Sequence, residues 1–421
     1  MFRARIRWPR KRDTGALTCA VIFNELTYYF FFLGPCVLAF HLLARVRNID
    51  LLRVRAYLLA TFGFLFFAYY GYSHFGGWKG SAGVALFAWE LLTSQLYRPR
   101  SRWCLFGIVQ AVAILIAFMY LGFFASSWNA IAGQNGHQLH GIPHLALPLG
   151  ISFFTFEFIH FAADVYLGRI ERRPYGTYAA FIFFFPTMIA GPIKRYGEFE
   201  PELERARFDS ALFMQGVTRI LCGLAKKQVL ADTFSLWSDK LATDALSSAP
   251  PRTIAAWILA YGMKIYLDFS GYSDIAIGSG YLFGIHIPEN FNWPYASKSI
   301  TEFWRRWHIS LGRWIFDYLY APLGGSRKGQ LRTAVNLIAA FCISGLWHGA
   351  AFNFLAWGVW HGAMMAVHRV WRSWDGRPTG PVWGVASLML TFIGVNIGWA
   401  FFCMDLPRAF FALGRMARVL A

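Results

Sequence analysis

Residues 343–365, ISGLWHGAAFNFLAWGVWHGAMM, are the most informative stretch of this sequence. They include no Asp, Glu, Lys or Arg, and the run is longer than the roughly 20 mostly apolar residues that a helix needs to cross a bilayer. His348 lies inside this apolar run. A histidine at membrane depth costs free energy unless it finds a partner or water, so it indicates a functional or internally bonded group. The stretch predicts a membrane protein with a polar site inside it.

The composition extends this prediction to the whole chain of 421 residues. Apolar residues make up 57%, aromatic residues 19% and charged residues 15%, whereas soluble domains have about 45–50% apolar and 25% charged residues. These values exclude a disordered chain, a collagen-like chain and a disulfide-rich secreted domain. The six cysteines are scattered without a C-x-x-C pair, so neither a zinc site nor a disulfide framework is predicted.

The apolar segments predict an all-α polytopic membrane protein of about 10–12 tilted and re-entrant helices. Candidate helices lie near residues 21–43, 56–70, 81–97, 103–125, 145–167, 178–193, 211–230, 252–267, 271–287, 310–322, 333–347, 352–371 and 382–403. Several of these segments are too short to span upright, notably those at 178–193, 271–287 and 310–322. Short pieces are tolerated at membrane depth only where protein buries them or where they line a wet cavity. We therefore expect an internal cavity.

The basic residues predict the orientation of the helices. The chain has 40 Lys and Arg against 22 Asp and Glu, a net charge of +18. Clusters at 45–55, 98–102 and 169–173 follow alternate segments, whereas residues 126–144 contain no Lys or Arg. By the positive-inside rule the clusters are cytoplasmic and residues 126–144 lie outside the cytoplasm. This placement between apolar segments argues against a nucleic-acid partner.

The first 20 residues conflict with this orientation. They carry six basic residues but lie across one predicted span from another basic cluster. We interpret residues 1–20 as a basic N-terminal extension, from a start site placed too far upstream, and residues 21–421 as a single domain. A signal peptide is less consistent with the sequence, because no small-residue cleavage site follows the apolar run.

A second polar stretch runs from residue 262 to residue 329 and contains DFSGYSD and EFWRRWHISL. For Asp268 and Asp274 we favour a structural role over a functional one, as caps of a broken helix. EFWRRWHISL reads as one helix with Ser299 or Thr301 as its N-cap. On that helix a single inward face would carry Trp304, Trp307, His308 and Leu311, while Arg305 and Arg306 point elsewhere or pair with Glu302. A core role and a cavity-lining role for His308 are equally compatible with this pattern.

His348 and His361 both occur in the sequence WHGA. On one continuous helix, residues thirteen apart lie roughly 140° from each other, so the two histidines should not share a site. We interpret His348 as functional and His361 as structural, and expect Ser344, Gly345, Gly349 and Ala350 to leave room for a substrate chain. The histidines at 137, 140 and 144 lack a nearby carboxylate and a continuous helix, so no metal site is predicted. GGSRKG at 324–329 lacks the strand-then-helix context of a phosphate loop.

These motifs resemble the membrane-bound O-acyltransferases, in particular their bacterial alginate O-acetyltransferase-like branch. The resemblance rests on stretches spread over nearly the whole chain from residue 21: LPLGISFFTFEFIHFAADVYLG at 147–168, FFPTMIAGPIKR at 184–195, GLAKKQVLAD at 223–232, the block at 262–329, and GLWHGAAFNFLAWGVWHG at 345–362. It implies a ring of tilted helices around a central tunnel. It also implies that His348 is the catalytic histidine and that His308 is the second histidine near the tunnel.

The resemblance also implies a reaction. Neutral imidazole, with an ordinary pKa near 6.5, can accept the proton of an attacking hydroxyl. We expect His348 to act as this base on a thioester and His308 to orient the donor or stabilise charge. The expected lining of the tunnel is Trp304, Trp307, Trp347, Asp268 and Asn290.

The expected function is acyl transfer, most simply of acetyl, from a cytoplasmic thioester such as acetyl-CoA to hydroxyls of an extracytoplasmic polysaccharide. The donor is a substrate, and no bound cofactor or metal is expected. The expected partners are membrane lipid, the polysaccharide and a periplasmic SGNH-like acetyltransferase, in the inner membrane of a bacterium. D-alanyl transfer to teichoic acid from a carrier-protein thioester is the nearest alternative. A proton-coupled transporter and a passive scaffold are rivals of other classes; the inverted repeats of many transporters are not visible in the sequence.

Overall fold

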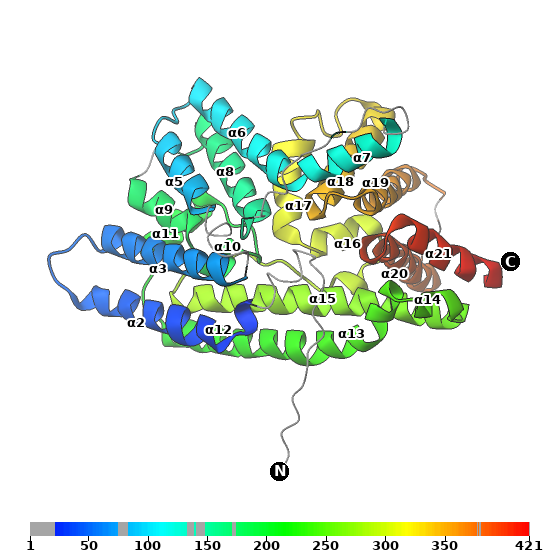
Figure 1. Cartoon of the computed structure of the whole chain (residues 1–421), viewed down its shortest axis with the longest axis horizontal. Coiled ribbons are helices and arrows are strands. Elements are labelled where there is room, and N and C mark those ends of the chain that lie inside the picture. Colours follow the sequence, from blue (N-terminus) through cyan, green and yellow to red (C-terminus); the bar gives the residue numbers. More distant parts are fainter. Residues whose placement is uncertain are drawn as a thin grey trace, which may run out of the picture.

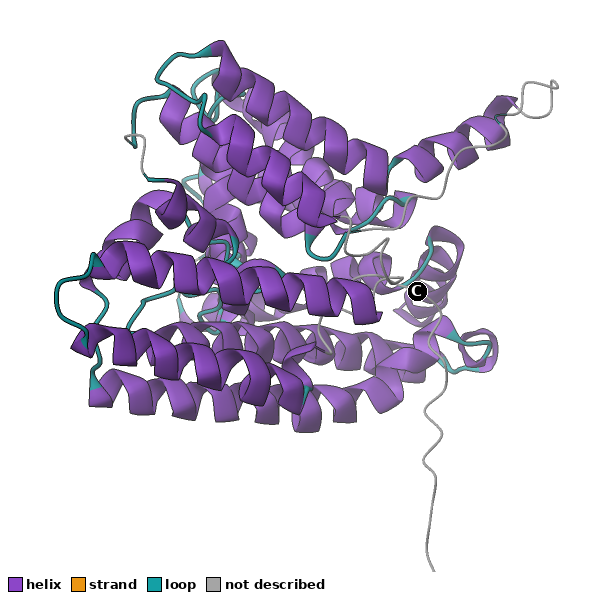
Figure 2. Ribbon diagram, turned by 60° about the vertical axis from the view of Figure 1, so that its left-hand side comes forward, coloured by secondary structure: helices purple, strands orange, loops and turns teal. Residues whose placement is uncertain are grey.

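Helix α15, Pro251–Leu282, is the longest helix in the described residues and lies in the lower part of the molecule in Figure 1. The computed structural model describes residues 22–74, 83–132, 139, 148–170, 174–376, 378 and 380–420, and in these residues the backbone forms helices and one isolated β-bridge. The basic extension at 1–20 and the histidines at 137–144 lie outside the described residues. Figure 2 shows the helices stacked in tilted layers. The fold is an all-α polytopic membrane protein, as predicted.

The other α-helices precede and follow α15 in the chain. Before it come α2 (Gly34–Leu42), α3 (Leu51–His74), α5 (Gly83–Ser94), α6 (Arg102–Met119), α7 (Leu121–Ala132), α8 (Ile151–Tyr166), α9 (Tyr175–Ile182), α10 (Phe185–Met188), α11 (Tyr196–Arg205), α12 (Ser210–Leu224), α13 (Asp232–Ser238) and α14 (Ala245–Ser248). After it come α16 (Ile300–Arg306), α17 (Ile309–Ile315), α18 (Gly329–His348), α19 (Phe352–Arg372), α20 (Pro381–Cys403) and α21 (Leu406–Leu420).

Four helical segments are long and apolar enough to cross a membrane. They are Tyr28–Arg45, Leu51–Ser73, Arg102–Met119 and Pro381–Cys403. Large apolar side chains on these helices are exposed on the surface of the protein, for example Val109 of α6 and Leu390 of α20. The protein is therefore a multi-pass membrane protein whose remaining helices are shorter or carry buried polar groups.

Helix α15 continues through DFSGYSD, so the prediction of a broken helix capped by its aspartates is wrong, and so is a separate segment at 271–287. Gly271 and Gly278 let α12 and the following π-helical turn Ala225–Ala231 pack against α15 at the distance of backbone contact. The aspartates pair across this interface. Asp274 accepts hydrogen bonds from Arg219 Nε at 2.9 Å and Lys226 Nζ at 2.6 Å, and Asp268 pairs with Lys227. Partners on a neighbouring helix stabilise the charges without a break in α15.

Two of the basic clusters lie at the same end of the helices. Arg100 N–H in the turn between α5 and α6 donates to the carbonyl oxygen of Tyr166 at the end of α8, at 3.0 Å. Arg169, which follows α8, pairs with Asp164 at 3.0 Å. The clusters at 98–102 and 169 are therefore neighbours, which agrees with one cytoplasmic face for both.

A buried ion pair holds the segment between α10 and α11 against α8. Lys194 Nζ donates to Glu157 Oε1 at 2.5 Å, and the two side chains are 1% and 5% exposed. The Lys194 ammonium also lies over the ring of Phe181, 4.4 Å from its centroid. The pair fixes a non-helical segment in the interior, where its Ile193 N–H reaches Ser310 Oγ at 2.9 Å. This contact joins the α8 region to the part of the molecule that contains His308.

Candidate active site

The chain breaks its helix at Trp307 and His308, so the prediction of one helix through EFWRRWHISL is wrong. Trp307 is extended and forms a β-bridge with Phe291, and His308 has φ 46° and ψ 54°, in the left-handed region. Asn292 N–H donates to Arg306 O at 2.9 Å, and Ile309 N–H donates to Asn290 O at 3.0 Å. Long-range pairing with residues 290–292 thus replaces the local helix bonds.

The start of α16 and its first ion pair are as predicted from the sequence. Ser299 is the N-cap of α16, and its hydroxyl accepts a hydrogen bond from Glu302 N–H. Arg306 pairs with Glu302 at 2.7 Å, as expected for side chains four apart on a helix.

The break turns the His308 ring away from the tryptophan face of α16. His308 is 3% exposed, and its Nδ1 lies 3.2 Å from Asn290 Oδ1. The ring of Phe269 on α15 meets its ring edge-on at 4.7 Å between centroids. Asn290 is completely buried behind His308.

His348 is the last residue of α18, at the turn that leads through Gly349 into α19. Its ring packs against Trp347, Phe402 and Trp357, with centroids 4.7, 5.0 and 5.6 Å away. Within the described part of the chain its ring nitrogens have no hydrogen-bond partner. The histidine thus sits in an aromatic surrounding at a helix end, and its nitrogens are not engaged by the described residues.

Trp347 brings the two predicted histidines together. Its ring lies 4.7 Å from that of His348 and 6.3 Å from that of His308, between centroids. Stacking on Phe156 at 5.0 Å and a hydrogen bond from its Nε1 to Ser152 O at 3.2 Å fix the indole in place. His308 and His348, forty residues apart in sequence, therefore flank one rigid ring.

His361 occupies a different place, in the middle of α19. It is completely buried, and in the described residues neither ring nitrogen has a hydrogen-bond partner. The rings of Trp304 and Trp357 lie 5.0 Å from it. Because α18 ends at His348, the two WHGA histidines do not share one helix, and the Trp357 ring separates them.

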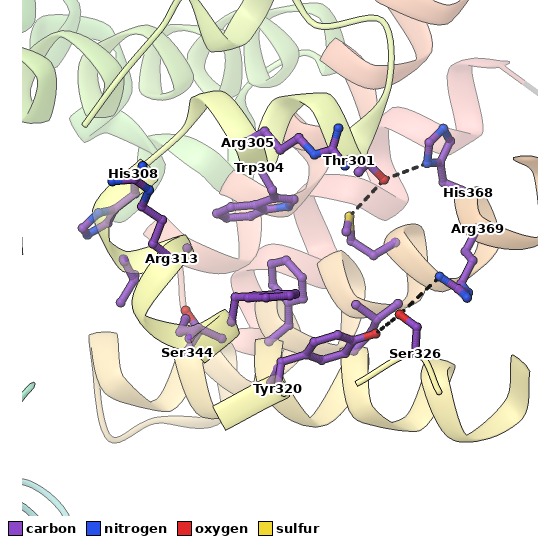
Figure 3. Close-up of a pocket in the computed structure, with 18 of the residues that line it drawn as sticks. Thr301, Trp304, Arg305, His308, Arg313, Tyr320, Ser326, Ser344, His368 and Arg369 are labelled. Atoms are coloured by element: carbon purple, nitrogen blue, oxygen red, sulfur yellow. Dashed lines mark hydrogen bonds between the residues drawn. The ribbon is translucent and has the colours of Figure 1, made fainter. Parts of the chain in front are cut away.

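A cavity of about 1050 Å³ begins at His308 and extends to the end of α19 (Figure 3). Trp304 lies in its middle, and Arg369 and His368 lie at the end away from His308. The wall also includes three further arginines, Arg305, Arg313 and Arg372. The carboxylate of Asp317 in the wall is paired with Arg195 at 2.6 Å. The cavity thus combines an apolar middle with an excess of guanidinium groups.

Of the residues expected at the tunnel, Trp304 and His308 line this cavity. Trp307 is buried against Phe303 and Trp399, and Trp347 stands between the two histidines. Asp268 faces Lys227 on the α12 side of α15, and Asn290 lies behind His308.

Of the four small residues near His348, Ser344 lines the cavity, whereas Phe354 occupies the space beside Gly345 and Gly349.

The residues at the basic end of the cavity were not predicted from the sequence. Met365, His368, Arg369 and Arg372 follow at i, i+3, i+4 and i+7 in the last turns of α19, which puts them on one face. That spacing was the signal that could have found them. Among the described residues no group of three or more His, Cys, Asp or Glu side chains is placed to hold a metal ion.

Comparison with known proteins gives a consistent family and several relatives. The profile of the membrane-bound O-acyltransferase family matches residues 165–407. A probable alginate O-acetylase of Pseudomonas putida is 38% identical over 91% of this chain and 77% of its own. A peptidoglycan O-acetyltransferase of Helicobacter pylori is 32% identical over 91% of this chain and 77% of its own. A teichoic acid D-alanyltransferase of Bacillus subtilis is 27% identical over 77% of this chain and 85% of its own.

Proposed function

This chain belongs to the membrane-bound O-acyltransferase family and is an O-acyltransferase, and we propose that it passes an acetyl group from a cytoplasmic thioester to hydroxyls of a polysaccharide outside the bacterial inner membrane. The observation that carries this proposal is the cavity that joins His308, beside the Trp347–His348 pair, to a wall rich in arginine.

The cavity suits an acyl thioester whose carrier bears phosphate. Guanidinium groups bind phosphate oxygens through paired hydrogen bonds, and Arg369 and Arg372 stand at the end of α19. The apolar middle, with Trp304, Phe341 and Leu337, suits a long flexible arm. Basic residues at helix ends favour the cytoplasmic side, where acetyl-CoA is available. The donor in this proposal is therefore acetyl-CoA, with the thioester near His308.

His348 is the general base of the proposed reaction. It takes the proton of the acceptor hydroxyl as the oxygen attacks the thioester carbonyl. The new C–O bond forms, the C–S bond breaks, and the leaving thiolate takes the proton back from the imidazolium. A positioned base of this kind contributes about 10²–10⁴-fold to the rate. His308 orients the donor in this scheme or stabilises the charge that develops.

The relatives support a polysaccharide as the final acceptor. The names of two of them refer to the acetylation of alginate and of peptidoglycan. In our proposal a periplasmic SGNH-like acetyltransferase is the partner that completes the transfer to the polymer. The relative named as a teichoic acid D-alanyltransferase makes D-alanyl transfer the second candidate, and the identity of the donor separates the two.

The test is transfer by the purified protein in lipid nanodiscs with two labelled donors. Radiolabelled acetyl-CoA should be consumed with release of free CoA, while a D-alanyl carrier-protein thioester should not. Consumption of the D-alanyl donor alone would contradict acetyl transfer and favour the second candidate.

A cavity-filling variant tests the place of the donor. Ser344→Phe puts a ring into the cavity, so the KM for acetyl-CoA should rise about tenfold or more through loss of close contacts. Ile343→Phe is the matched control, because Ile343 directly precedes Ser344 on α18 and is 49% exposed. Equal KM values for the two variants would place the donor elsewhere.

A further inference from the structure

We propose that Asn290 is a positioning residue that holds His308 in the tautomer with the proton on Nδ1, so that Nε2 offers a lone pair to the ligand. The inference rests on the proposed function, because it assigns His308 one of the two roles left open there. As an acceptor, His308 orients the donor and does not stabilise negative charge.

The orientation of the Asn290 amide follows from its neighbours. Its Oδ1 accepts hydrogen bonds from Ser310 N–H at 3.3 Å and from Ser310 Oγ at 2.8 Å. A backbone N–H can only donate, so the amide atom on this side must be the carbonyl oxygen. The amide nitrogen points the other way and donates to Ser273 Oγ at 3.3 Å. The orientation of the Asn290 amide is therefore fixed by the Ser310 backbone N–H, which can only donate.

The same oxygen determines which ring nitrogen of His308 carries the proton. Nδ1 lies 3.2 Å from Asn290 Oδ1, and a carbonyl oxygen cannot donate. Nδ1 must carry the hydrogen of this bond, which leaves Nε2 of the neutral ring as an acceptor. Nε2 points away from Asn290 by the geometry of the ring.

The backbone reinforces this arrangement. The β-bridge between Phe291 and Trp307 and the bond from Ile309 N–H to Asn290 O align the two segments. They hold His308 at φ 46°, a left-handed conformation that a non-glycine residue keeps only where its surroundings impose it. Strain of this kind is concentrated at functional sites. Asn290 thus fixes both the ring and the backbone of His308.

The missing hydrogen bond at Nε2 of His308 indicates a ligand. The atom is buried and has no hydrogen-bond partner among the described residues, although buried polar atoms are nearly always partnered. His308 is also part of the cavity wall. A ligand that reaches this wall with an N–H or O–H group would supply the missing bond. The amide N–H groups of a pantetheine arm are donors of this chemistry.

The experiment reads the tautomer directly, by NMR of protein labelled with nitrogen isotope in its histidines, in nanodiscs. The His308 signal is assigned by its loss in His308→Gln. We expect Nδ1 to show the shift and proton coupling of a protonated nitrogen and Nε2 those of an unprotonated one. A protonated Nε2 in the resting protein would overturn the proposal. This reading uses the wild-type fold and does not depend on whether any Asn290 variant folds.

Variants connect the tautomer with function. Asn290→Ala should raise the KM for acetyl-CoA about tenfold, the effect of one lost hydrogen bond in a buried site, and should weaken the Nδ1–H signal. Asn290→Asp keeps an acceptor oxygen and should restore the signal and much of the KM. Ser273→Ala is the control, since it removes only the partner of the amide nitrogen. An Asn290→Ala protein with wild-type tautomer and KM would contradict the assignment.

The two proposals fail in different ways. If His308→Ala transfers acetyl at the wild-type rate and KM, the role of His308 in the proposed function is wrong whatever the tautomer is. If His308→Ala is impaired but Nε2 carries the proton, the proposed function stands and the role of Asn290 is wrong.

Discussion

His308 and His348 flank the same indole but are held in different ways. Asn290 and an unusual backbone conformation fix His308, whereas in the described residues His348 is held by packing against Trp347, Trp357 and Phe402. A fixed ring suits a group that orients a ligand. A ring with both nitrogens available suits a group that accepts a proton and gives it back. The difference supports the division of roles that we propose for the two histidines.

His361 provides a test at the scale of one residue. Its buried nitrogens have no hydrogen-bond partner among the described residues, and its ring neighbours include Trp304, Trp357 and Trp399. Replacing an unpartnered buried polar group with an apolar one of similar size is close to neutral or stabilising. His361→Leu should keep the Tm of the wild type or raise it, and should keep the transfer rate within about twofold.

The comparison for this prediction is His308→Ala, which should lose far more activity than His361→Leu in the same assay. If the order of the two variants were reversed, the structural interpretation of His361 would be wrong.

The resemblance implied a place at the tunnel for His308 and a catalytic role for His348, but it did not predict how His308 is oriented. WHGA and WRRWHIS are local patterns, and the resemblance that they carry led to both residues. The break at Trp307 comes from hydrogen bonds to residues 290–292, which no periodicity within 299–311 can reveal. Asn290 was expected at the tunnel and lies behind His308 because of the same pairing. Long-range pairing overrode a local helical pattern.

At the scale of elements, the interior depends on polar contacts between helices and irregular segments. The clearest example is the pair of Lys194 and Glu157, which ties the segment after α10 to α8. From that segment Ile193 reaches Ser310, and Ser310 in turn bonds Asn290. The motif FFPTMIAGPIKR therefore supports the region of His308 without contributing to the cavity wall.

The buried pair predicts a characteristic stability pattern. Lys194→Met leaves the Glu157 carboxylate buried without its cation and should lower the free energy of unfolding by about 3–5 kcal/mol. The double variant Glu157→Leu/Lys194→Met removes both charges and should recover most of the loss. Denaturation in mild detergent would measure both. A double variant as unstable as the single one would show that the pair does not act as a unit.

Helix length could be predicted only in part. The all-α class and the apolar spans follow directly from hydropathy. The continuity of α15 does not, because DFSGYSD looks like a break when it is read alone. Its glycines face the backbones of α12 and the turn after it, and its aspartates face Arg219, Lys226 and Lys227. The partners that make the sequence acceptable in a helix are about 40–55 residues away in the chain.

At the scale of the whole molecule, the net charge of +18 acts mainly through its distribution. The cluster at 98–102 meets the end of α8, and Arg369 and Arg372 stand at the basic end of the cavity. If both groups face the cytoplasm, the positive-inside rule explains orientation and donor recognition together. The same charges would then orient the helices and bind phosphate.

Cysteine labelling in intact cells tests this orientation. Arg102→Cys, at the start of α6, should react only with a reagent that enters the cytoplasm. Ser126→Cys, on the exposed side of α7, should react with a reagent that cannot cross the membrane. A Cys222→Ser background removes the cysteine that is exposed among the described residues. Labelling of both sites from the same side would refute the proposed topology.

The central claim is that His348 is the base of acyl transfer from a thioester. It is tested most directly by the rate of CoA release from acetyl-CoA by His348→Gln in nanodiscs, with the acceptor present. The exposed His286→Gln serves as the control. We predict a fall in kcat of about 10²-fold or more for His348→Gln, with an unchanged Tm and KM, and a wild-type rate for the control. A folded His348→Gln protein that releases CoA and acetylates the acceptor at the wild-type rate would contradict the claim.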